Sequence, residues 1–330
     1  MSLQVLKSGL LDTIQDRGRF GYAHLGINPS GAMDTIALAL ANMLVGNPAE
    51  TAALELHFPG PRLRFELPAL FALGGGDFMP RLNGVPIPVH TPVAAGAGSV
   101  LSFSGIKNGA RAYLAVRGGF RLEPWLGSRS TNRAAGAGGF QGRALQTGDL
   151  LAFEPLPELE KITAGRRQRV SSWSLNTSGF YPPGPTMRFC AGPEYDWLDT
   201  RSKHLLENND WLITPQSDRM GYRMQGAPLQ MAEKQDLISS VVTPGTLQLL
   251  PNGSFIILMA DSQTTGGYPR VGQLITADLP GLAQMLPGQH IRLCPVDPAT
   301  AFATLRQQDQ LLRKLQWSCT LRLKGYGLEG

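Results

Sequence analysis

Short apolar runs separated by glycine, proline and asparagine dominate the first half of the chain. Such runs, broken by turn residues, are typical of strands rather than of long helices. In the second half, the apolar run 254–260 has strand length and ends at a turn signal. The pattern predicts an antiparallel barrel or sandwich. An opening strand and turn over 4–12 is followed by strand-like runs near 52–57, 62–73, 99–104, 111–116 and 149–153.

Two helices are predicted at sites where a capping residue precedes an apolar period. Ser30 is the expected N-cap of the first helix, with Asp34 in its first turn, and the helix is expected to run to about Leu44, before Gly46-Asn-Pro48. The second helix begins at Pro298 after Asp297 and is expected to end at about 315. We therefore expect a mainly β fold with a few short helices.

The length of 330 residues favours two domains, because a single core rarely grows beyond 250–300 residues. The segment 155–169 has two prolines, alternating charges and no apolar period, so we interpret it as a linker. The segments 146–155 and 286–295 share a glycine, an alternating strand and a closing proline, which favours two similar barrels. The predicted domains are 1–160 and 161–330.

Composition argues against several functional classes. The formal charge is +5 and the basic residues are scattered, so nucleic-acid binding is not expected. The three cysteines, Cys190, Cys294 and Cys319, are far apart, and the five histidines never take metal-site spacing, so we expect no metal. The longest largely apolar segment, 36–45, is half a membrane span, and we expect no signal peptide and a cytoplasmic protein.

The stretch 217–226 is the first candidate site. In an extended strand Arg219, Gly221, Arg223 and Gln225 share one face, because successive side chains alternate. Two guanidiniums on either side of a glycine fit a carboxylate or phosphate. The alternative is a half-buried strand whose arginines are solvated.

The stretch 261–270 is the second candidate. Its polar side chains and glycines follow a strand, and a glycine pair permits the dihedrals of an anion-binding backbone nest. An ordinary decorated loop is the alternative. The candidate residues of this stretch are Asp261, Gln263, Thr264, Gly266, Gly267 and Tyr268.

The first half adds a group with one cation among hydroxyls, Arg129 with Ser128, Ser130 and Thr131, which suits phosphate. Three acidic residues could serve either the site or only the fold. In the structural alternative, Asp34 complements a helix N-terminus, Glu55 satisfies backbone donors, and Glu194 begins a helix. The sequence contains no Gly-x-x-x-x-Gly-Lys-Ser/Thr loop and no Gly-x-Ser-x-Gly motif.

Ordered segments along nearly the whole chain strongly resemble the biotin-dependent carboxyltransferase-like family, which includes allophanate hydrolase subunit 2 and the C subunit of the ATP-hydrolysing 5-oxoprolinase. The segments that carry the resemblance are 9–19, 30–34, 44–48 with Glu55, 113–119, 126–131, 192–194, 217–226 and 261–269.

The resemblance implies two cyclophilin-like β-barrels that act with B-like and A-like subunits of 5-oxoprolinase. It implies ATP-dependent opening of a lactam, 5-oxoproline, with ATP used by the complex. Transfer of a carboxyl group from carboxybiotin to urea or a related amide is an alternative, but the chain lacks a Met-Lys-Met biotin-attachment motif. A third possibility is a non-catalytic regulator that binds a B-like partner.

For the lactam reaction, donors aimed at the developing oxyanion should dominate catalysis. We therefore expect Arg219 and Arg223 to hold the substrate carboxylate or a phosphate, and Asp261 to orient water or a partner group. Gly266 and Gly267, with Gln263 and Thr264, would form the donor wall. The stretches around Gln15-Asp16 and Ser128 to Thr131, with Arg129, would close the cleft from the other half.

Overall fold

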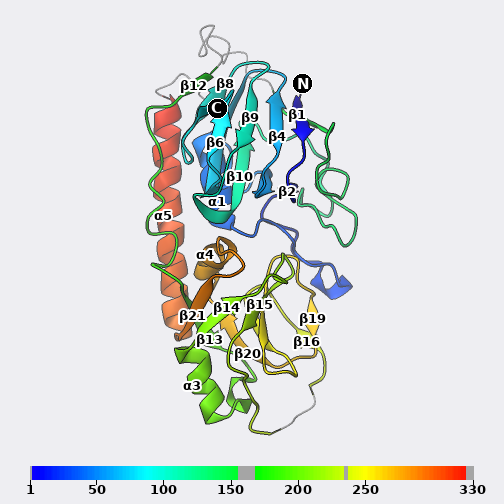
Figure 1. The fold of residues 1–330 in the computed structure, drawn as a ribbon, viewed down its shortest axis with the longest axis vertical. Coiled ribbons are helices and arrows are strands. Elements are labelled where there is room, and N and C mark those ends of the chain that lie inside the picture. The colour runs from blue at the N-terminus through cyan, green and yellow to red at the C-terminus, as the bar shows by residue number, and fades with distance from the viewer. Residues whose placement is uncertain (1, 155–167, 234–236, 325–330) are drawn as a thin grey trace. The chain divides into compact units, whose positions relative to one another are not determined.

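The computed structural model describes residues 2–154, 168–233 and 237–324, and β-strands dominate it (Figure 1). The mainly β prediction is confirmed. The chain forms two compact units: unit 1 comprises residues 1–19, 30–177 and 311–330, and unit 2 comprises 20–29 and 178–310. This division differs from the predicted boundary at 160/161. Most of the predicted linker, 155–167, lies outside the described residues, and 168–170 form a strand of unit 1.

Unit 1 contains two antiparallel sheets of six strands each. The first sheet has the spatial order β11 (Leu150–Ala152), β1 (Ser2–Lys7), β4 (Arg62–Phe65), β9 (Val100–Phe103), β6 (Pro80–Leu82) and β7 (Val85–Pro86). The second has the order β12 (Gln168–Val170), β8 (Val93–Ala95), β5 (Ala69–Asp77), β10 (Asn108–Val116), β3 (Ala53–His57) and β2 (Thr13–Gln15).

The second sheet of unit 1 is buried on both faces. In β10, Ala112, Leu114 and Val116 belong to the core that includes strands of both sheets, whereas Tyr113 and Ala115 pack with α1 (Thr35–Leu44). A strand covered on both faces is apolar along its length, which explains why β10 lacks alternation. Gly74 permits the close packing, because a Cβ there would lie 2.4 Å from the Ala37 carbonyl oxygen of α1.

The first helix ends where predicted, at Leu44, but its N-cap is Asp34 rather than Ser30. Asp34 Oδ1 accepts a 2.8 Å hydrogen bond from the Ala37 N–H, so the carboxylate satisfies a backbone donor of the first turn. The predicted strand 62–73 is two strands, β4 and β5. They separate at 66–68, which contains Pro68, and proline cannot donate to a sheet.

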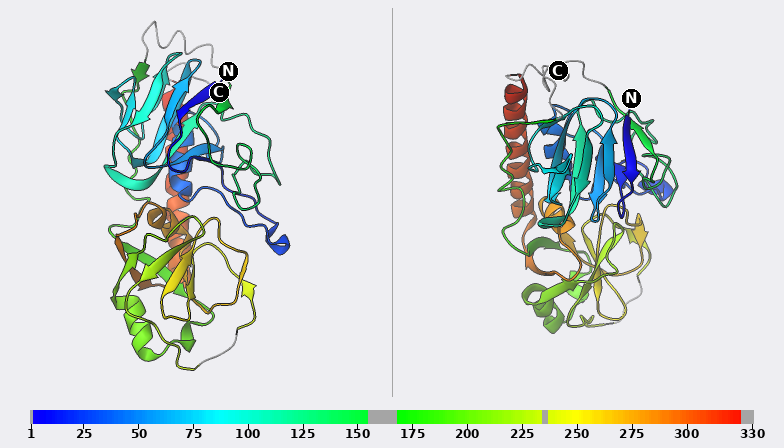
Figure 2. Two further views of the ribbon diagram at one scale, coloured as in Figure 1. Left: turned by 45° about the vertical axis from the view of Figure 1, so that its right-hand side comes forward. Right: turned by 45° about the horizontal axis from the view of Figure 1, so that its top comes forward.

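Unit 2 is built around a closed barrel, in which only β13 and β21 are parallel (Figure 2). Trp211 and Phe255 meet edge to face in its core, with ring centroids 4.8 Å apart. The strands around the barrel are β13 (Thr186–Ala191), β20 (Arg270–Leu274), β17 (Thr246–Leu249), β18 (Phe255–Leu258), β15 (Gly221–Gln225), β14 (Asp210–Ile213) and β21 (His290–Pro295).

Short elements surround the barrel, and one long helix contributes to both units. The short elements are the hairpin β16 (Ser240–Val241) and β19 (Thr265–Gly266), and the helices η1 (Ala23–Leu25), η2 (Tyr195–Trp197), α3 (Thr200–Asn208), η3 (Thr276–Asp278) and α4 (Leu279–Ala283). Helix α5 (Pro298–Lys324) has 27 residues and is longer than predicted. Its first turn is capped as expected, since Asp297 Oδ1 accepts a hydrogen bond from Thr300 N–H.

The two units differ in strand order. Unit 1 has two open sheets enclosing a core, whereas unit 2 has one closed barrel. The similar segments 146–155 and 286–295 contain β11 and β21. Strand β11 lies at the edge of a sheet, whereas β21 is part of the closed barrel. Among the described residues, no helix is both long and apolar enough to cross a membrane.

Candidate functional site

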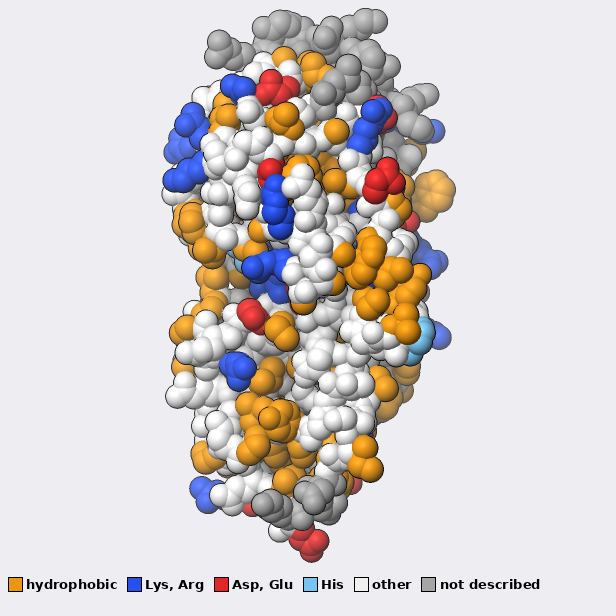
Figure 3. All heavy atoms as spheres, turned by 90° about the vertical axis from the view of Figure 1, so that its right-hand side faces the viewer, with side chains coloured by type: hydrophobic (Ala, Val, Ile, Leu, Met, Phe, Trp, Pro, Cys, Tyr) orange, Lys and Arg blue, Asp and Glu red, His pale blue; other side chains and the backbone are white. Residues whose placement is uncertain are grey.

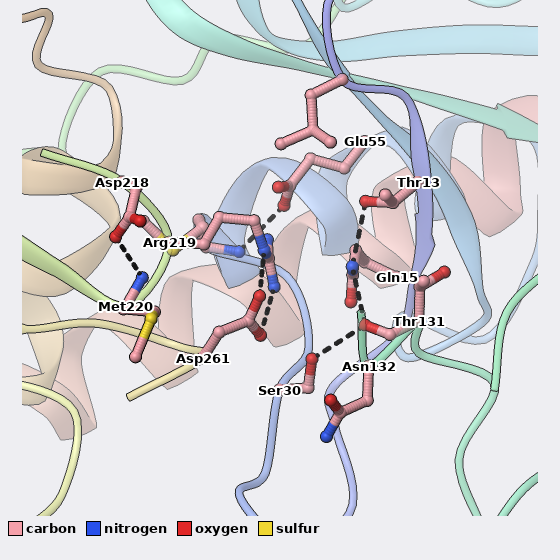
Figure 4. A network of polar contacts seen from close by, with 12 residues as sticks. Thr13, Gln15, Ser30, Glu55, Thr131, Asn132, Asp218, Arg219, Met220 and Asp261 are labelled. Atoms are coloured by element: carbon pink, nitrogen blue, oxygen red, sulfur yellow. Dashed lines mark hydrogen bonds and ion pairs between the residues drawn. The ribbon is translucent and has the colours of Figure 1, made fainter. Parts of the chain in front are cut away.

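Arg219 and Asp261, one from each candidate stretch of unit 2, form a two-pronged ion pair (Figure 4). Arg219 Nε and Nη2 donate to Asp261 Oδ2 and Oδ1 at 2.7 and 3.0 Å. The Arg219 side chain is 6% exposed and that of Asp261 18%. Two parallel N–H to oxygen bonds fix both planes, so the orientation of the Asp261 carboxylate is set by Arg219.

Backbone pairing around the barrel brings these residues together. Beyond the paired strands β15 and β18, the Asp261 N–H donates to the Arg219 carbonyl at 2.8 Å. Asp218 holds the turn before β15, because its Oδ1 accepts from Met220 N–H at 2.8 Å (Figure 4). Asn28 Nδ2 donates to the Asp261 carbonyl at 2.7 Å. The expectation that the two stretches meet is confirmed within unit 2.

The expected pair of guanidiniums is wrong. Arg219 lies before β15 rather than in it and is buried, whereas Arg223 lies within β15 and is exposed. Arg219 is committed to Asp261, so it does not combine with Arg223 into a two-armed anion clamp. The alternation prediction fails at this point because the strand begins at Gly221.

The predicted backbone nest at the glycine pair is also wrong. Neither Gly266 nor Gly267 has a positive φ, and Gly266 belongs to β19, paired with Ser240. The reason for glycine at 266 is space: a Cβ would lie 2.3 Å from Gln248 Nε2.

The other candidates of this stretch are placed in different environments. Gln263 is exposed and donates to Gln248 Oε1 at 3.1 Å. Thr264 is buried, its carbonyl accepting from Val242 N–H, and Tyr268 is 45% exposed. The predicted role of Gln263 and Thr264 in a donor wall has no support in this geometry, and the predicted role of Tyr268 in substrate binding stays a prediction.

In unit 1, Asp16 and the segment 128–131 form one network. Asp16 Oδ1 accepts from the hydroxyls of Ser128 and Ser130 at 2.6 and 2.5 Å. Asp16 Oδ2 accepts from the Arg129 N–H at 2.6 Å. The Arg129 side chain is exposed and donates to the Leu122 carbonyl. The carboxylate thus occupies the hydroxyl cluster that we expected to bind phosphate.

Gln15 and Thr131 meet beside this network (Figure 4). Gln15 Nε2 donates to Thr13 Oγ1 at 3.0 Å and to the Thr131 carbonyl at 3.4 Å. The Ser30 hydroxyl donates to the same carbonyl at 3.0 Å. The two first-half stretches contact each other, whereas their closing over the stretches of unit 2 stays a prediction.

The structural alternatives for the acidic residues are the ones observed. Glu55 Oε2 accepts from the Tyr113 hydroxyl at 2.6 Å and from the Met33 N–H at 3.0 Å. Burial, with Glu55 and Asp34 nearby, raises the pKa of the Tyr113 phenol. Glu194 precedes η2 and pairs with Arg270, which lowers the pKa of Glu194.

Sequence reasoning missed Asn28 and the partner of Glu55. Asn28 lies in Gly26-Ile-Asn-Pro29 and secures the backbone of Asp261 from a segment far away in sequence. Tyr113 begins a segment already noted for the resemblance, but nothing in its local pattern indicates that it faces Glu55. The register of β10 and β3 places Tyr113 opposite Glu55.

Comparison with known proteins identifies the family. Residues 25–295 match the family model described as carboxyltransferase domain, subdomain A and B. The chain belongs to this family. The resemblance inferred from the ordered motifs is thereby confirmed.

Relatives within this carboxyltransferase family span two kinds of protein. The chain is 36% identical to the C subunit of 5-oxoprolinase from Escherichia coli, over 96% of this chain and 98% of that one. It is 35% identical to the C subunit of 5-oxoprolinase from Haemophilus influenzae, over 91% and 92%. The solved structure of K. lactis urea amidolyase superposes with a TM-score of 0.86 and 28% identity, over 95% of this chain but only 20% of that one.

The glycine-rich segment 136–142 of this family member packs closely against its own chain. A Cβ at Gly138 would lie 2.2 Å from the Ser130 carbonyl, and one at Gly139 would lie 1.9 Å from Thr131 Oγ1. These glycines therefore allow the loop to pack on its own chain rather than to approach a phosphate. Within the described ranges, no group of three or more His, Cys, Asp or Glu could hold a metal ion.

Proposed function

We propose that this chain is the C subunit of an ATP-dependent 5-oxoprolinase complex, which opens 5-oxo-L-proline to L-glutamate. One observation carries the proposal: the match to the E. coli 5-oxoprolinase C subunit extends over 96% of this chain and 98% of the relative. The likeness to urea amidolyase, by contrast, occupies one fifth of that much longer protein.

The proposed reaction adds water to the lactam carbonyl carbon and breaks the carbon–nitrogen bond. The nitrogen gains a proton and leaves as the amine of glutamate, while the carbonyl carbon becomes a carboxylate. The sequence contains no Gly-x-x-x-x-Gly-Lys-Ser/Thr loop, so we assign ATP to the complex and no step on this chain to it. Asp261, oriented by Arg219, is the group that would position the water.

The proposed partners are the B-like and A-like subunits of 5-oxoprolinase, and the proposed compartment is the cytoplasm, where ATP is supplied. Exposed apolar side chains support a role in an assembly. Phe20, three residues before η1, and Leu25, the last residue of η1, are 68% and 64% exposed. Figure 3 shows hydrophobic side chains gathered in groups on the face turned toward the viewer. Such groups often mark protein interfaces.

The test is glutamate release from 5-oxoproline in the complex reconstituted from the three proposed subunits. We expect release that requires both ATP and this chain. The control is the same mixture without this chain, with the other two proteins at the same concentrations. Equal release with and without the chain would show that it has no part in the reaction.

A second candidate is a biotin-dependent carboxyltransferase that acts on urea or a related amide. The TM-score of 0.86 to urea amidolyase favours it. Biotin would be the cofactor, carried on another protein because the sequence lacks a Met-Lys-Met motif. Transfer of labelled carboxyl from carboxybiotin to urea, with no ATP-dependent glutamate release, would favour this candidate over 5-oxoprolinase.

A further inference from the structure

An open hollow lies on the exposed side of α5, in the part of the helix that belongs to unit 1. Its volume is about 260 Å³, and four side chains of the helix line it: Arg313, Gln316, Trp317 and Thr320. These are positions i, i+3, i+4 and i+7, so they share one face of the helix. On the other side of α5, Cys319 and Leu323 are buried.

Trp317 gives this face a large exposed apolar surface. It is 72% exposed, and Leu321, one turn later on the same face, is 68% exposed. Exposed apolar groups of this kind often mark protein interfaces. Tryptophan and arginine, both present at the hollow, are also enriched among the residues that supply most of the binding energy at interfaces.

The size and shape of the hollow fit a side chain rather than a small molecule. Pockets for small molecules have volumes of about 300–1,000 Å³ and enclose most of the ligand. This hollow is smaller and is lined by one helix alone. A second helix presents side chains at the same spacing of i, i+3, i+4 and i+7, so it can lie along α5 and insert one apolar side chain beside Trp317.

The charge of this part of α5 determines the kind of helix that it would bind. Residues 310–324 include four cations, Arg313, Lys314, Arg322 and Lys324, and no Asp or Glu. No ion pair joins any of the four to an acidic residue within 2–154, 168–233 or 237–324. Complementary charge steers association, so these cations favour an acidic partner.

The same charge argues against a second copy of this chain. Two α5 helices paired through Trp317 would bring the cations of both copies face to face, and like charges across an interface are costly. An anionic membrane would attract the cations, but a helix that lies in a membrane surface presents a long apolar face. Among residues 311–324, the exposed large apolar side chains are those of Trp317 and Leu321.

We propose that the hollow over 313–320 is the docking site for an amphipathic helix that carries acidic residues beside its apolar face. The inference rests on the proposed function for the source of this helix, which is another subunit of the complex. An apolar side chain of the helix fills the hollow against Trp317, and its carboxylates pair with Arg313 and Lys314. The site lies in unit 1, whereas the exposed segment 20–25 belongs to unit 2.

The experiment measures the association and dissociation rates of the purified B-like and A-like subunits, each on the full-length immobilised chain. We expect Trp317→Ala to weaken the binding of one of these subunits by about 10-fold or more, chiefly through faster dissociation. Arg313→Glu should slow association several-fold at low salt. That difference should shrink as the salt concentration rises to about 0.5 M, because salt screens exposed charges.

Two exposed residues of unit 1 provide matched controls. Leu10 is 67% exposed, so Leu10→Ala removes an exposed apolar side chain elsewhere. Arg133→Glu reverses an exposed charge elsewhere. Both control variants should bind the subunits as the native chain does. Urea unfolding of all four variants should match the native chain, because each replaced side chain is exposed.

Three results would overturn the proposal. The first is native binding by both Trp317→Ala and Arg313→Glu. The second is that neither subunit binds the native chain. The third is that Trp317→Ala abolishes only a dimer of this chain, seen by sedimentation, or only binding to vesicles of phosphatidylserine and phosphatidylcholine.

Two further outcomes separate this inference from the proposed function. If subunit binding depends on Trp317 but the reconstituted complex releases no glutamate with ATP, the 5-oxoprolinase proposal fails and the docking site stands. If glutamate is released and both Trp317→Ala and Arg313→Glu bind the subunits as the native chain does, the docking site fails and the proposed function stands.

Discussion

Arg219 and Asp261 hold each other through two hydrogen bonds, so a change in either side chain releases the other. A paired charge that loses its partner in a buried place is costly, and the freed side chain also loses its orientation. If the proposed function is right, the pair acts as a single unit, and its two members should respond alike to substitution.

Asp261→Asn and Arg219→Lys should each lower glutamate release by about 10- to 100-fold, because neither variant keeps both parallel hydrogen bonds. The measurement is kcat and KM of the reconstituted complex. The matched control is Arg292→Lys, which alters an Arg–Asp pair with Asp210 that is 61% and 52% exposed. Native turnover in Asp261→Asn would exclude a role for this carboxylate.

The buried carboxyl group of Asp12 should make the free energy of unfolding depend on pH. Asp12 is 1% exposed, and burial raises its pKa from 3.8 to about 7 against the opposing hydrogen bond from Gly9 N–H. Between pH 4 and pH 7 the folded chain therefore binds more protons at Asp12 than the unfolded chain. The contribution of Asp12 to stability falls as pH rises through this window and stays low above it.

Asp12→Asn, which is neutral at every pH, should be more stable than the native chain at pH 8 by a few kcal/mol, at about 1.4 kcal/mol per pKa unit. The advantage should shrink towards pH 4. Urea unfolding at pH 4.5, 6 and 8 checks this, with the exposed Glu123→Gln as control. A loss of stability at pH 8 would mean that Asp12 is ionised in the fold.

At the scale of elements, the C-terminal half of α5 packs through one face and exposes apolar side chains elsewhere. Leu323 is 4% exposed and belongs to the cluster that includes α1, whereas Leu321, two positions earlier, is 68% exposed. Trp317 is 72% exposed as well. Because these apolar residues are exposed, apolar positions in this part of the chain do not repeat every 3.6 residues. The sequence therefore predicted that the helix ends near 315 rather than at Lys324.

Leu323→Ala should cost about 2–4 kcal/mol of unfolding free energy, since it leaves a cavity against α1. Leu321→Ala, on the same helix and of the same chemistry, should cost less than about 0.5 kcal/mol. Urea unfolding of the two variants gives both numbers. Equal losses would show that the end of α5 does not pack in unit 1.

The strands were predicted well where a short apolar run ends at turn residues. The role of individual glycines was predicted less well, because it depends on tertiary contacts. The runs that became β3, β9 and β10 were located within a few residues. The glycine pair 266–267 was misjudged, because its backbone is extended and Gly266 makes room for Gln248. A glycine required for space and a glycine required for positive φ are identical in the sequence.

At the scale of the whole molecule, each unit includes a segment from the other half of the chain. Residues 20–29 belong to unit 2, and 311–330 belong to unit 1. The strand β12, beyond the predicted boundary, pairs with β8 of unit 1. A cut at 160/161 therefore separates partners on both sides.

The fragments 1–160 and 161–330, made separately, should each melt at a lower temperature than the full chain or without a cooperative transition. Fragment 1–160 lacks β12 and Leu323, and fragment 161–330 lacks Asn28, which holds the Asp261 carbonyl. Circular dichroism melts of both fragments and of the full chain test this. Two cooperative transitions at native temperatures would show that the halves fold independently.

The sequence by itself determined the β-rich class, the end of α1, the family and the segments that carry the candidate residues, because these depend on local periodicity, turn residues and ordered motifs. Only the tertiary structure decided which side chains face one another. Arg219 and Asp261 are 42 positions apart, and Asp16 and Ser130 are 114 apart. Their pairing depends on strand register and on barrel closure, which place distant residues together. The structure therefore shows an ion pair where the sequence predicted an anion-binding site.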